Sequence, residues 1–345
     1  MIAIAIGCSL AACSGVNETG STNTRSANTR SANIGSAGAS ADSTPSSATQ
    51  STTPVAPSPI SPVPDAPSAI SPVPDSPSPD APSPDAPLPE SPVALSEALT
   101  EAERAIRDPT LDSPTAQRWG RRAQRLYSVL TEHREWAPET LASVGEDVAL
   151  DVELNWTARQ NLSALVTSTA PATELPAWRI SEPLPPDTLL AYYHEAQDAT
   201  GVPWSVLAAI HLIETRMGRI EGLSTAGAVG PMQFLPSTWQ ACCEGDPTVD
   251  RDAILGAATY LAQSGAPGNL DRAIYAYNHS DRYVSAVRAY ADVLERNELA
   301  YRGLHGFEVY FLSSAGLLHL APGYEEPEPV AAADWLAIHP DALVR

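Results

Sequence analysis

Residues 203–218 have the sequence PWSVLAAIHLIETRMG. Pro203 stands where a helix can begin, because its missing N–H and fixed φ suit the first turn. The apolar residues recur at spacings of 4, 3 and 4, which predicts a helix with a core stripe formed by Val206, Ile210, Ile213 and Met217. Glu214 follows directly on this stripe, and we expect the helix to end at Gly218.

Glu214 is therefore expected at the border of an apolar face, near the C-terminal end of a helix. Partial burial disfavours the charged carboxylate and raises its pKa, and the negative end of the helix dipole acts in the same direction. A Glu that stays protonated near neutral pH is suited to act as a general acid in glycosidic cleavage. The alternative is a solvated carboxylate, or one that forms a salt bridge with Arg216 or Arg219.

The next segment, residues 224–239, has the sequence STAGAVGPMQFLPSTW. Its glycines at 227 and 230 allow the backbone to turn tightly or to come close to a ligand. Met232 offers a soft apolar contact and Gln233 an amide that donates and accepts. Pro236 starts another predicted helix. Further on, a helix that begins near Leu270 ends at residues 276–280, AYNHS, and Asp281 opens the following one.

The order and spacing of three motifs resemble those of the lytic murein transglycosylases. The motifs are Glu214-Thr-Arg-Met-Gly, Ser224 with its Gly-Ala-Val-Gly and Met-Gln-Phe neighbours, and Tyr277-Asn278. These lysozyme-like enzymes cleave peptidoglycan. The resemblance implies that Glu214 is the single catalytic acid/base. It implies further that five residues bind the substrate: Ser224, Met232, Gln233, Tyr277 and Asn278. Tyr277 as a core aromatic and Met232 as plain packing remain alternatives.

The resemblance also implies a reaction. Glu214 protonates the oxygen that bridges N-acetylmuramic acid to N-acetylglucosamine, the muramyl N-acetyl group assists, and a 1,6-anhydro ring closes without water. That is a carbon–oxygen lyase acting on peptidoglycan glycan strands, with no cofactor and no metal ion. One alternative is a hydrolytic muramidase, which needs a second carboxylate; Glu221 is the nearest candidate in the sequence. The other is a non-catalytic wall-binding lipoprotein.

The N-terminus predicts export to the cell envelope. Residues 1–13 resemble a signal peptide that ends in a lipobox, Leu-Ala-Ala-Cys, although the usual positive region is missing. Cys13 would carry a lipid anchor on the outer face of the membrane, or the chain is secreted if the lipobox is not used. Residues 14–92 are rich in Pro, Ser and Asp and predict a disordered linker.

The fold class predicted for the rest is mainly α. Residues 93–184 form a helical accessory region of three amphipathic runs, residues 185–324 a lysozyme-like α(+β) catalytic domain, and residues 325–345 an acidic flexible tail. Cys242 and Cys243 form a vicinal disulfide or remain buried thiols. We expect a monomer.

Composition excludes several other classes of protein. The 345 residues carry a net charge of -21, and all basic residues are Arg. An acidic chain without a basic region has little to bind a nucleic-acid backbone. The absence of Lys excludes Schiff-base chemistry and a P-loop. No apolar run approaches the length of about 20 residues that a membrane-spanning helix needs.

Overall fold

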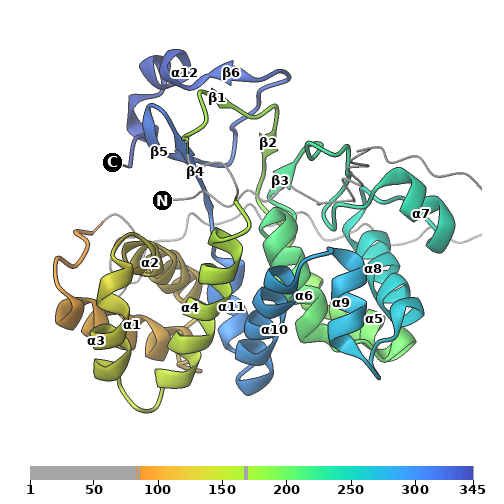
Figure 1. Cartoon of the computed structure of the whole chain (residues 1–345), viewed down its shortest axis with the longest axis horizontal. Coiled ribbons are helices and arrows are strands. Elements are labelled where there is room, and N and C mark those ends of the chain that lie inside the picture. The colour runs from red at the N-terminus through yellow and green to blue at the C-terminus, as the bar shows by residue number, and fades with distance from the viewer. Residues whose placement is uncertain (1–82, 84–85, 167–169, 345) are drawn as a thin grey trace, which may run out of the picture. The chain divides into compact units, whose positions relative to one another are not determined.

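The computed structural model describes residue 83 and residues 86–166 and 170–344, which are mainly helical (Figure 1). This confirms the predicted mainly-α class. The predicted signal peptide, Cys13 and most of the predicted linker lie outside the described residues. In the described ranges, no helix combines the length and the apolar character needed to cross a membrane.

The helices and strands of the described residues have the following bounds. The α-helices are α1 (Pro92–Ile106), α2 (Ser113–Glu132), α3 (Ala137–Ser143), α4 (Ala149–Ser163), α5 (Pro186–Thr200), α6 (Trp204–Thr215), α7 (Pro236–Cys242), α8 (Asp250–Ser264), α9 (Leu270–Tyr277), α10 (Asp281–Arg296), α11 (Ala300–His305) and α12 (Ala332–Ile338). The antiparallel strand pairs are β1 (Glu174–Leu175) with β6 (Val330–Ala331), β2 (Arg179–Ile180) with β3 (Ile220–Glu221), and β4 (Val309–Ser313) with β5 (Gly316–Leu320).

Local signals set most helix boundaries. The predicted starts at Pro236 and Asp281 are confirmed, and α5 likewise begins at a proline, Pro186. Gly201 ends α5 in the left-handed region, with φ 77°, where glycine has no Cβ penalty. The Asn269 side chain caps α9 by accepting a hydrogen bond from a backbone N–H of the first turn.

A first hydrophobic core joins α1, α2, α3 and α4. Its fully buried side chains include Leu99, Leu126 and Leu130. The apolar pattern predicts the third helical run from near Pro138 through Leu162 as one helix, whereas the structure divides it into α3 and α4. Gly145 lies in the break between them, and its N–H donates to the Thr100 hydroxyl of α1 at 3.0 Å.

A second core is built from α5, α6, α8, α9, α10 and α11. The end of α4 also belongs to it, through Ala158 and Leu162, and α4 lies against α10. The predicted boundary at residue 184 between an accessory region and a catalytic domain therefore does not divide the cores. α2 and α11 also cross closely, since a Cβ at Gly120 would lie 2.0 Å from the carbonyl oxygen of Gly303.

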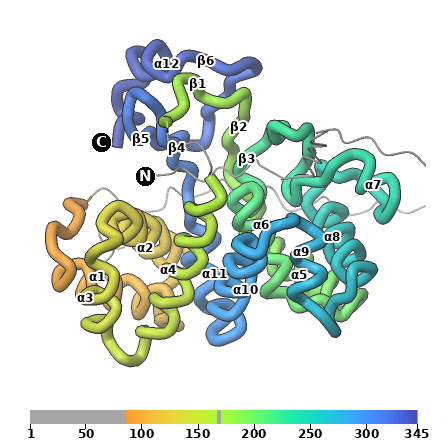
Figure 2. Tube along the Cα trace, viewed as in Figure 1, coloured from red at the N-terminus to blue at the C-terminus, as the bar shows by residue number. Residues whose placement is uncertain are grey.

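A third, smaller core lies among the strand pairs and α12. It includes Leu175, Leu318, Tyr324 and Trp335. Figure 2 shows β1 and β6 side by side although they are far apart in the sequence. This corrects the prediction of a flexible tail at 325–345, because pairing with β1 and burial of Trp335 order this segment.

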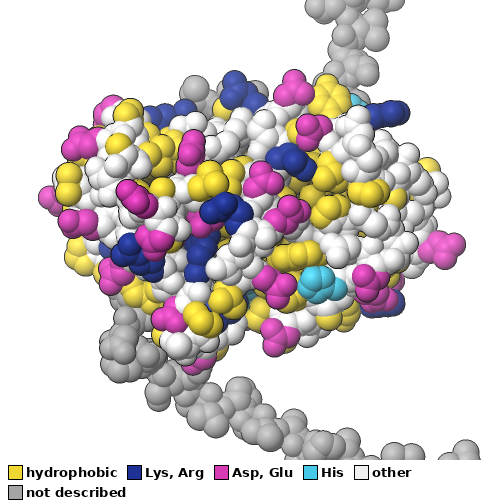
Figure 3. All heavy atoms as spheres, turned by 90° about the horizontal axis from the view of Figure 1, so that it is seen from below, with side chains coloured by type: hydrophobic (Ala, Val, Ile, Leu, Met, Phe, Trp, Pro, Cys, Tyr) yellow, Lys and Arg dark blue, Asp and Glu magenta, His cyan; other side chains and the backbone are white. Residues whose placement is uncertain are grey.

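The surface reflects the acidic composition. One face carries Asp and Glu side chains interspersed with hydrophobic ones and with arginines (Figure 3). Such mixing is typical of a solvated protein surface.

Candidate active site

Glu214 lies in the last turn of α6, a helix in the second core. Every α6 side chain from Ser205 to Thr215 is buried, so the helix runs through the core rather than across its surface. Glu214 itself is 2% exposed. The predicted shelter beside the apolar stripe is confirmed, and the burial is deeper than at the border of a helix face.

The chain turns sharply directly after Glu214. α6 ends at Thr215, before the predicted end at Gly218, because Arg216 and Met217 adopt φ angles of 58° and 62°. Left-handed backbone costs a residue with a Cβ about 1–2 kcal/mol. Such strain concentrates at functional sites, and here it follows a buried carboxyl group.

The carboxyl group of Glu214 has one hydrogen-bond partner among the described residues. The Tyr283 hydroxyl donates to Glu214 Oε1 at 2.6 Å, whereas the buried Oε2 bonds to no described residue. Burial raises the pKa of Glu214 to about 8, and the hydrogen bond from Tyr283 lowers it in part. Glu214 is therefore protonated at neutral pH, as the sequence predicts.

The salt-bridge alternative for Glu214 is not observed with Arg219. That guanidinium instead forms an ion pair with Glu182 at 2.8 Å. Arg216 donates through Nη1 to the carbonyl oxygen of Leu212 at 2.7 Å. Burial and Tyr283 are the influences that set the pKa of Glu214.

Tyr283 is a site residue that the sequence analysis missed. It lies in the first turn of α10 and is fully buried. Its sequence position resembles that of an ordinary core residue, because Ala286 and Val287 follow on the same buried face. The sequence offers only a general signal for Tyr283, namely that a buried tyrosine hydroxyl needs a hydrogen-bond partner.

Tyr277 and Asn278 lie where α9 ends. The Tyr277 hydroxyl donates to the carbonyl oxygen of Met232 at 2.5 Å. Burial raises the pKa of Tyr277, and the charge of Glu214 adds to this rise. Asn278 is 2% exposed, and neither atom of its side-chain amide bonds to a described residue. A buried amide without partners is costly, which makes Asn278 suited to a polar ligand group.

The 224–234 loop is held by its own hydrogen bonds. The Ser224 hydroxyl accepts from the N–H groups of Ala226 and Ala228 at 3.2 and 2.9 Å. The Gln233 amide donates to the carbonyl oxygen of Gly230 at 2.9 Å. Both side chains therefore shape the loop, a role that the sequence analysis did not predict for them.

Met232 belongs to the second core. Its side chain is fully buried among the hydrophobic residues there, which agrees with plain packing, the alternative to substrate binding that the sequence left open. Its carbonyl oxygen is the part that faces the site, because that atom receives the Tyr277 hydrogen bond.

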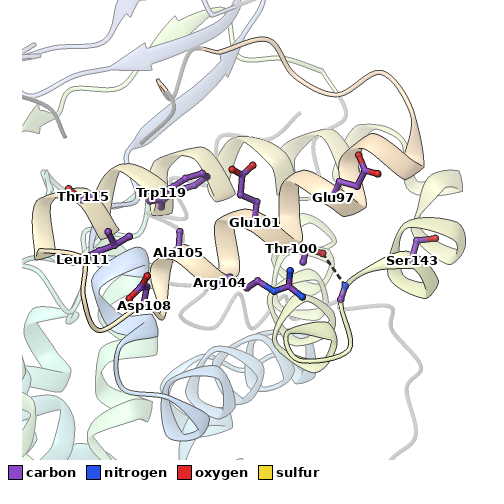
Figure 4. Close-up of a pocket in the computed structure, with 11 residues that line it drawn as sticks. Glu97, Thr100, Glu101, Arg104, Ala105, Asp108, Leu111, Thr115, Trp119 and Ser143 are labelled. Atoms are coloured by element: carbon purple, nitrogen blue, oxygen red, sulfur yellow. Dashed lines mark hydrogen bonds between the residues drawn. The ribbon is translucent and has the colours of Figure 1, made fainter. Parts of the chain in front are cut away.

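Three cavities lie outside this site. The first, of about 710 Å³, lies beside α1 and α2 (Figure 4). The second, of about 520 Å³, lies near the C-terminus, and the third, of about 390 Å³, lies beside Cys242 and Cys243. None of the residues that line these three is a predicted catalytic or substrate-binding residue. Figure 4 shows Glu97 and Glu101 along one side of α1, with Arg104 pointing elsewhere; Arg104 pairs with Asp147 at 2.7 Å.

The part of the chain that the structure describes holds no group of three His, Cys, Asp or Glu side chains placed to bind a metal ion. In the comparisons with known proteins, no family model, no curated protein and no solved structure matches the chain.

A Tyr283→Phe variant tests the hydrogen bond to Glu214. Because that bond lowers the pKa of Glu214, we expect its removal to raise this pKa and to cost about 1–2 kcal/mol of stability. The pKa is measured by NMR titration of the Glu carboxyl carbons. Tyr290→Phe, which alters another buried tyrosine of α10, is the matched control and should leave the pKa unchanged. An unchanged pKa in Tyr283→Phe would refute the contact.

Proposed function

We propose that the chain is a peptidoglycan lytic transglycosylase with a lysozyme-like catalytic region. It would cleave the bond between N-acetylmuramic acid and N-acetylglucosamine and leave a 1,6-anhydro end. The observation that carries this proposal is Glu214: a buried carboxyl group with a pKa of about 8 and an Oε2 that bonds to no described residue. A proton held at neutral pH on an unbonded oxygen is what a general acid must offer.

The geometry supports a single-carboxyl mechanism. Tyr283 donates to Glu214 Oε1, and Oε2 is buried and bonds to no described residue. In the proposed mechanism Oε2 carries the proton, and substrate binding has to open a path from it to the bridging oxygen. The carboxylate left behind is unstable in its buried site. It therefore takes up the proton of the muramyl C6 hydroxyl as the anhydro ring closes, and Glu214 returns to its starting state.

Asn278 supplies the recognition that such a mechanism needs. When the substrate's own N-acetyl carbonyl attacks C1, no second protein carboxylate is required. The buried donor and acceptor of the Asn278 amide match the acceptor and donor of an N-acetyl group. Binding would satisfy both partners at once, and this would orient the carbonyl.

A hydrolytic muramidase on the same scaffold is the competing function. Its second carboxylate would be Glu221 or Asp250. Glu221 accepts a hydrogen bond from Ser181 and pairs with Arg179 at 3.6 Å, and its side chain is 49% exposed. Asp250 faces His211 Nε2 at 3.7 Å, and burial raises its pKa.

Mass analysis of the products of purified peptidoglycan separates these functions. We expect muropeptides one water lighter than hydrolytic products, from the wild-type chain and from the Glu221→Gln and Asp250→Asn variants alike. If the wild-type chain gives products of hydrolytic mass, and one of these variants does not, the protein is a muramidase. No product at all would indicate a wall-binding protein.

The location of the enzyme belongs to the same proposal. A chain lipidated at Cys13 would be exported and anchored to the outer face of the membrane, where peptidoglycan glycan strands lie within reach of a long linker. A Pro-rich linker extends by roughly 3 Å per residue.

A further inference from the structure

Cys242 and Cys243 are bonded to each other at the end of α7. Of the two sequence alternatives, the vicinal disulfide is the one observed. Both residues line the cavity of about 390 Å³, together with Glu244, Asp252 and Leu255. A small thiol therefore has space to reach the sulfurs.

The segment that carries the disulfide contacts Trp239. The Cys243 N–H donates to the Trp239 carbonyl oxygen at 2.9 Å, and Trp239 Nε1 donates to the carbonyl oxygen of Gly245 at 3.3 Å. Cys243 Sγ lies 3.5 Å from the carbonyl oxygen of Gly256. The indole ring also packs closely against Gly256, because a Cβ added at Gly256 would lie 2.4 Å from Trp239 Cζ3.

Aromatic contacts continue from Trp239 to the candidate active site. The rings of Trp239 and Phe234 meet edge to face, with centroids 5.1 Å apart, and Phe234 meets Tyr277 in the same way at 5.7 Å. Tyr277 in turn donates to Met232, and it lies within the electrostatic influence of Glu214. Hydrogen bonds and ring contacts thus connect the disulfide segment to Tyr277, and the charge of Glu214 acts on Tyr277.

We propose that the Cys242–Cys243 disulfide is a redox-dependent positioning element for the Glu214 site. When it is closed, it holds Trp239 and, through Phe234, the position of Tyr277. When it is open, two unbonded sulfurs must separate to about 3.5–4 Å, which displaces the end of α7 and releases the indole. The activity part of this proposal rests on the proposed function, whereas the conformational part does not.

The chemistry requires a dithiol reductant. One of its thiolates attacks a sulfur of the pair and forms a mixed disulfide, and its second thiolate then displaces the cysteine. Two electrons pass to the cysteine pair, each cysteine sulfur takes up one proton, and the dithiol becomes a disulfide.

Hydrogen–deuterium exchange of the full chain, with and without dithiothreitol, tests the conformational part. Opening of the pair is verified by its gain of two hydrogens in mass. We expect faster exchange at residues 229–234 and 239–245 in the reduced chain, and no change in α2. Equal exchange in both states at residues 229–234 would overturn the proposal.

Kinetics on peptidoglycan test the activity part. We expect reduction to lower kcat about tenfold or more, because small misplacements of catalytic groups are costly, while KM stays within about twofold. A smaller folded fraction would also lower the apparent kcat at constant KM, so the folded fraction is measured by circular dichroism and kcat is expressed per folded molecule. Unchanged kcat in the reduced chain would refute the positioning role.

A Cys242→Ser/Cys243→Ser double variant is the matched control. It should behave as the reduced chain does and should not respond to dithiothreitol. Circular dichroism checks that the double variant folds. If it does not fold, the measurements on the reduced wild-type chain alone test the proposal. Absence of cleavage in both redox states would overturn the proposed function, whereas equal exchange would overturn the coupling.

Discussion

We expect Glu214→Gln to abolish the proposed cleavage of peptidoglycan while the protein stays folded. The variant lacks the proton that the mechanism transfers, and loss of a positioned general acid lowers kcat by a factor of about 10³ or more. The side chain keeps an oxygen in place of Oε1, so the hydrogen bond from Tyr283 survives. The measurement is the rate of muropeptide release, with circular dichroism as the test of folding.

The matched control for this variant is Glu221→Gln. It makes the same chemical change at a half-exposed carboxylate that pairs with Arg179, and we expect close to wild-type cleavage. Residual activity of Glu214→Gln within tenfold of wild type would remove Glu214 from the mechanism, and with it the proposed reaction.

The second large effect is on stability as a function of pH. The pKa of Glu214 is about 8 in the folded chain, against an ordinary value of 4.5. Between these two pH values the folded state binds a proton that the unfolded state has lost, so the free energy of unfolding falls as pH rises. Each pH unit costs about 1.4 kcal/mol. The contribution of Glu214 to the free energy of unfolding is therefore fully present below pH 4.5 and is lost as pH rises through 8. The total loss is up to about 5 kcal/mol.

Urea unfolding of the wild type and of Glu214→Gln, from pH 4 to pH 9, isolates this contribution. All other titrating groups are shared, so they cancel in the difference between the two proteins. We expect the two to be similarly stable at pH 4, and Glu214→Gln to be the more stable by several kcal/mol at pH 8. Parallel curves over the whole range would show that Glu214 titrates normally in the folded chain.

Local chemistry made much of the fold predictable. Pro186, Pro203 and Pro236 precede or begin helices because proline suits a first turn, and Gly201 ends one because glycine adopts positive φ without cost. The prediction was wrong where the end of an element depends on distant contacts. α6 closes early through left-handed Arg216, a residue that carries no such signal.

The candidate site was predictable in part for the same reason. Glu214 stands beside an apolar stripe, so its burial and raised pKa follow from helical periodicity. Met232 was assigned to a groove on resemblance and lies in the core instead. Tyr283 was missed because its hydroxyl meets a carboxyl group 69 residues earlier in the chain.

By itself, the sequence determined the helical class, the positions where most helices begin, and the burial of one carboxyl group. These depend on residues within one or two turns of each other, where spacing decides which side chains share a face. Only the tertiary structure decided which residue forms a hydrogen bond with Glu214. It also decided that residues 330–342 adopt an ordered structure, and that contacts connect Cys243 to Tyr277. Each of these joins segments far apart in the sequence, and packing of whole elements brings them together.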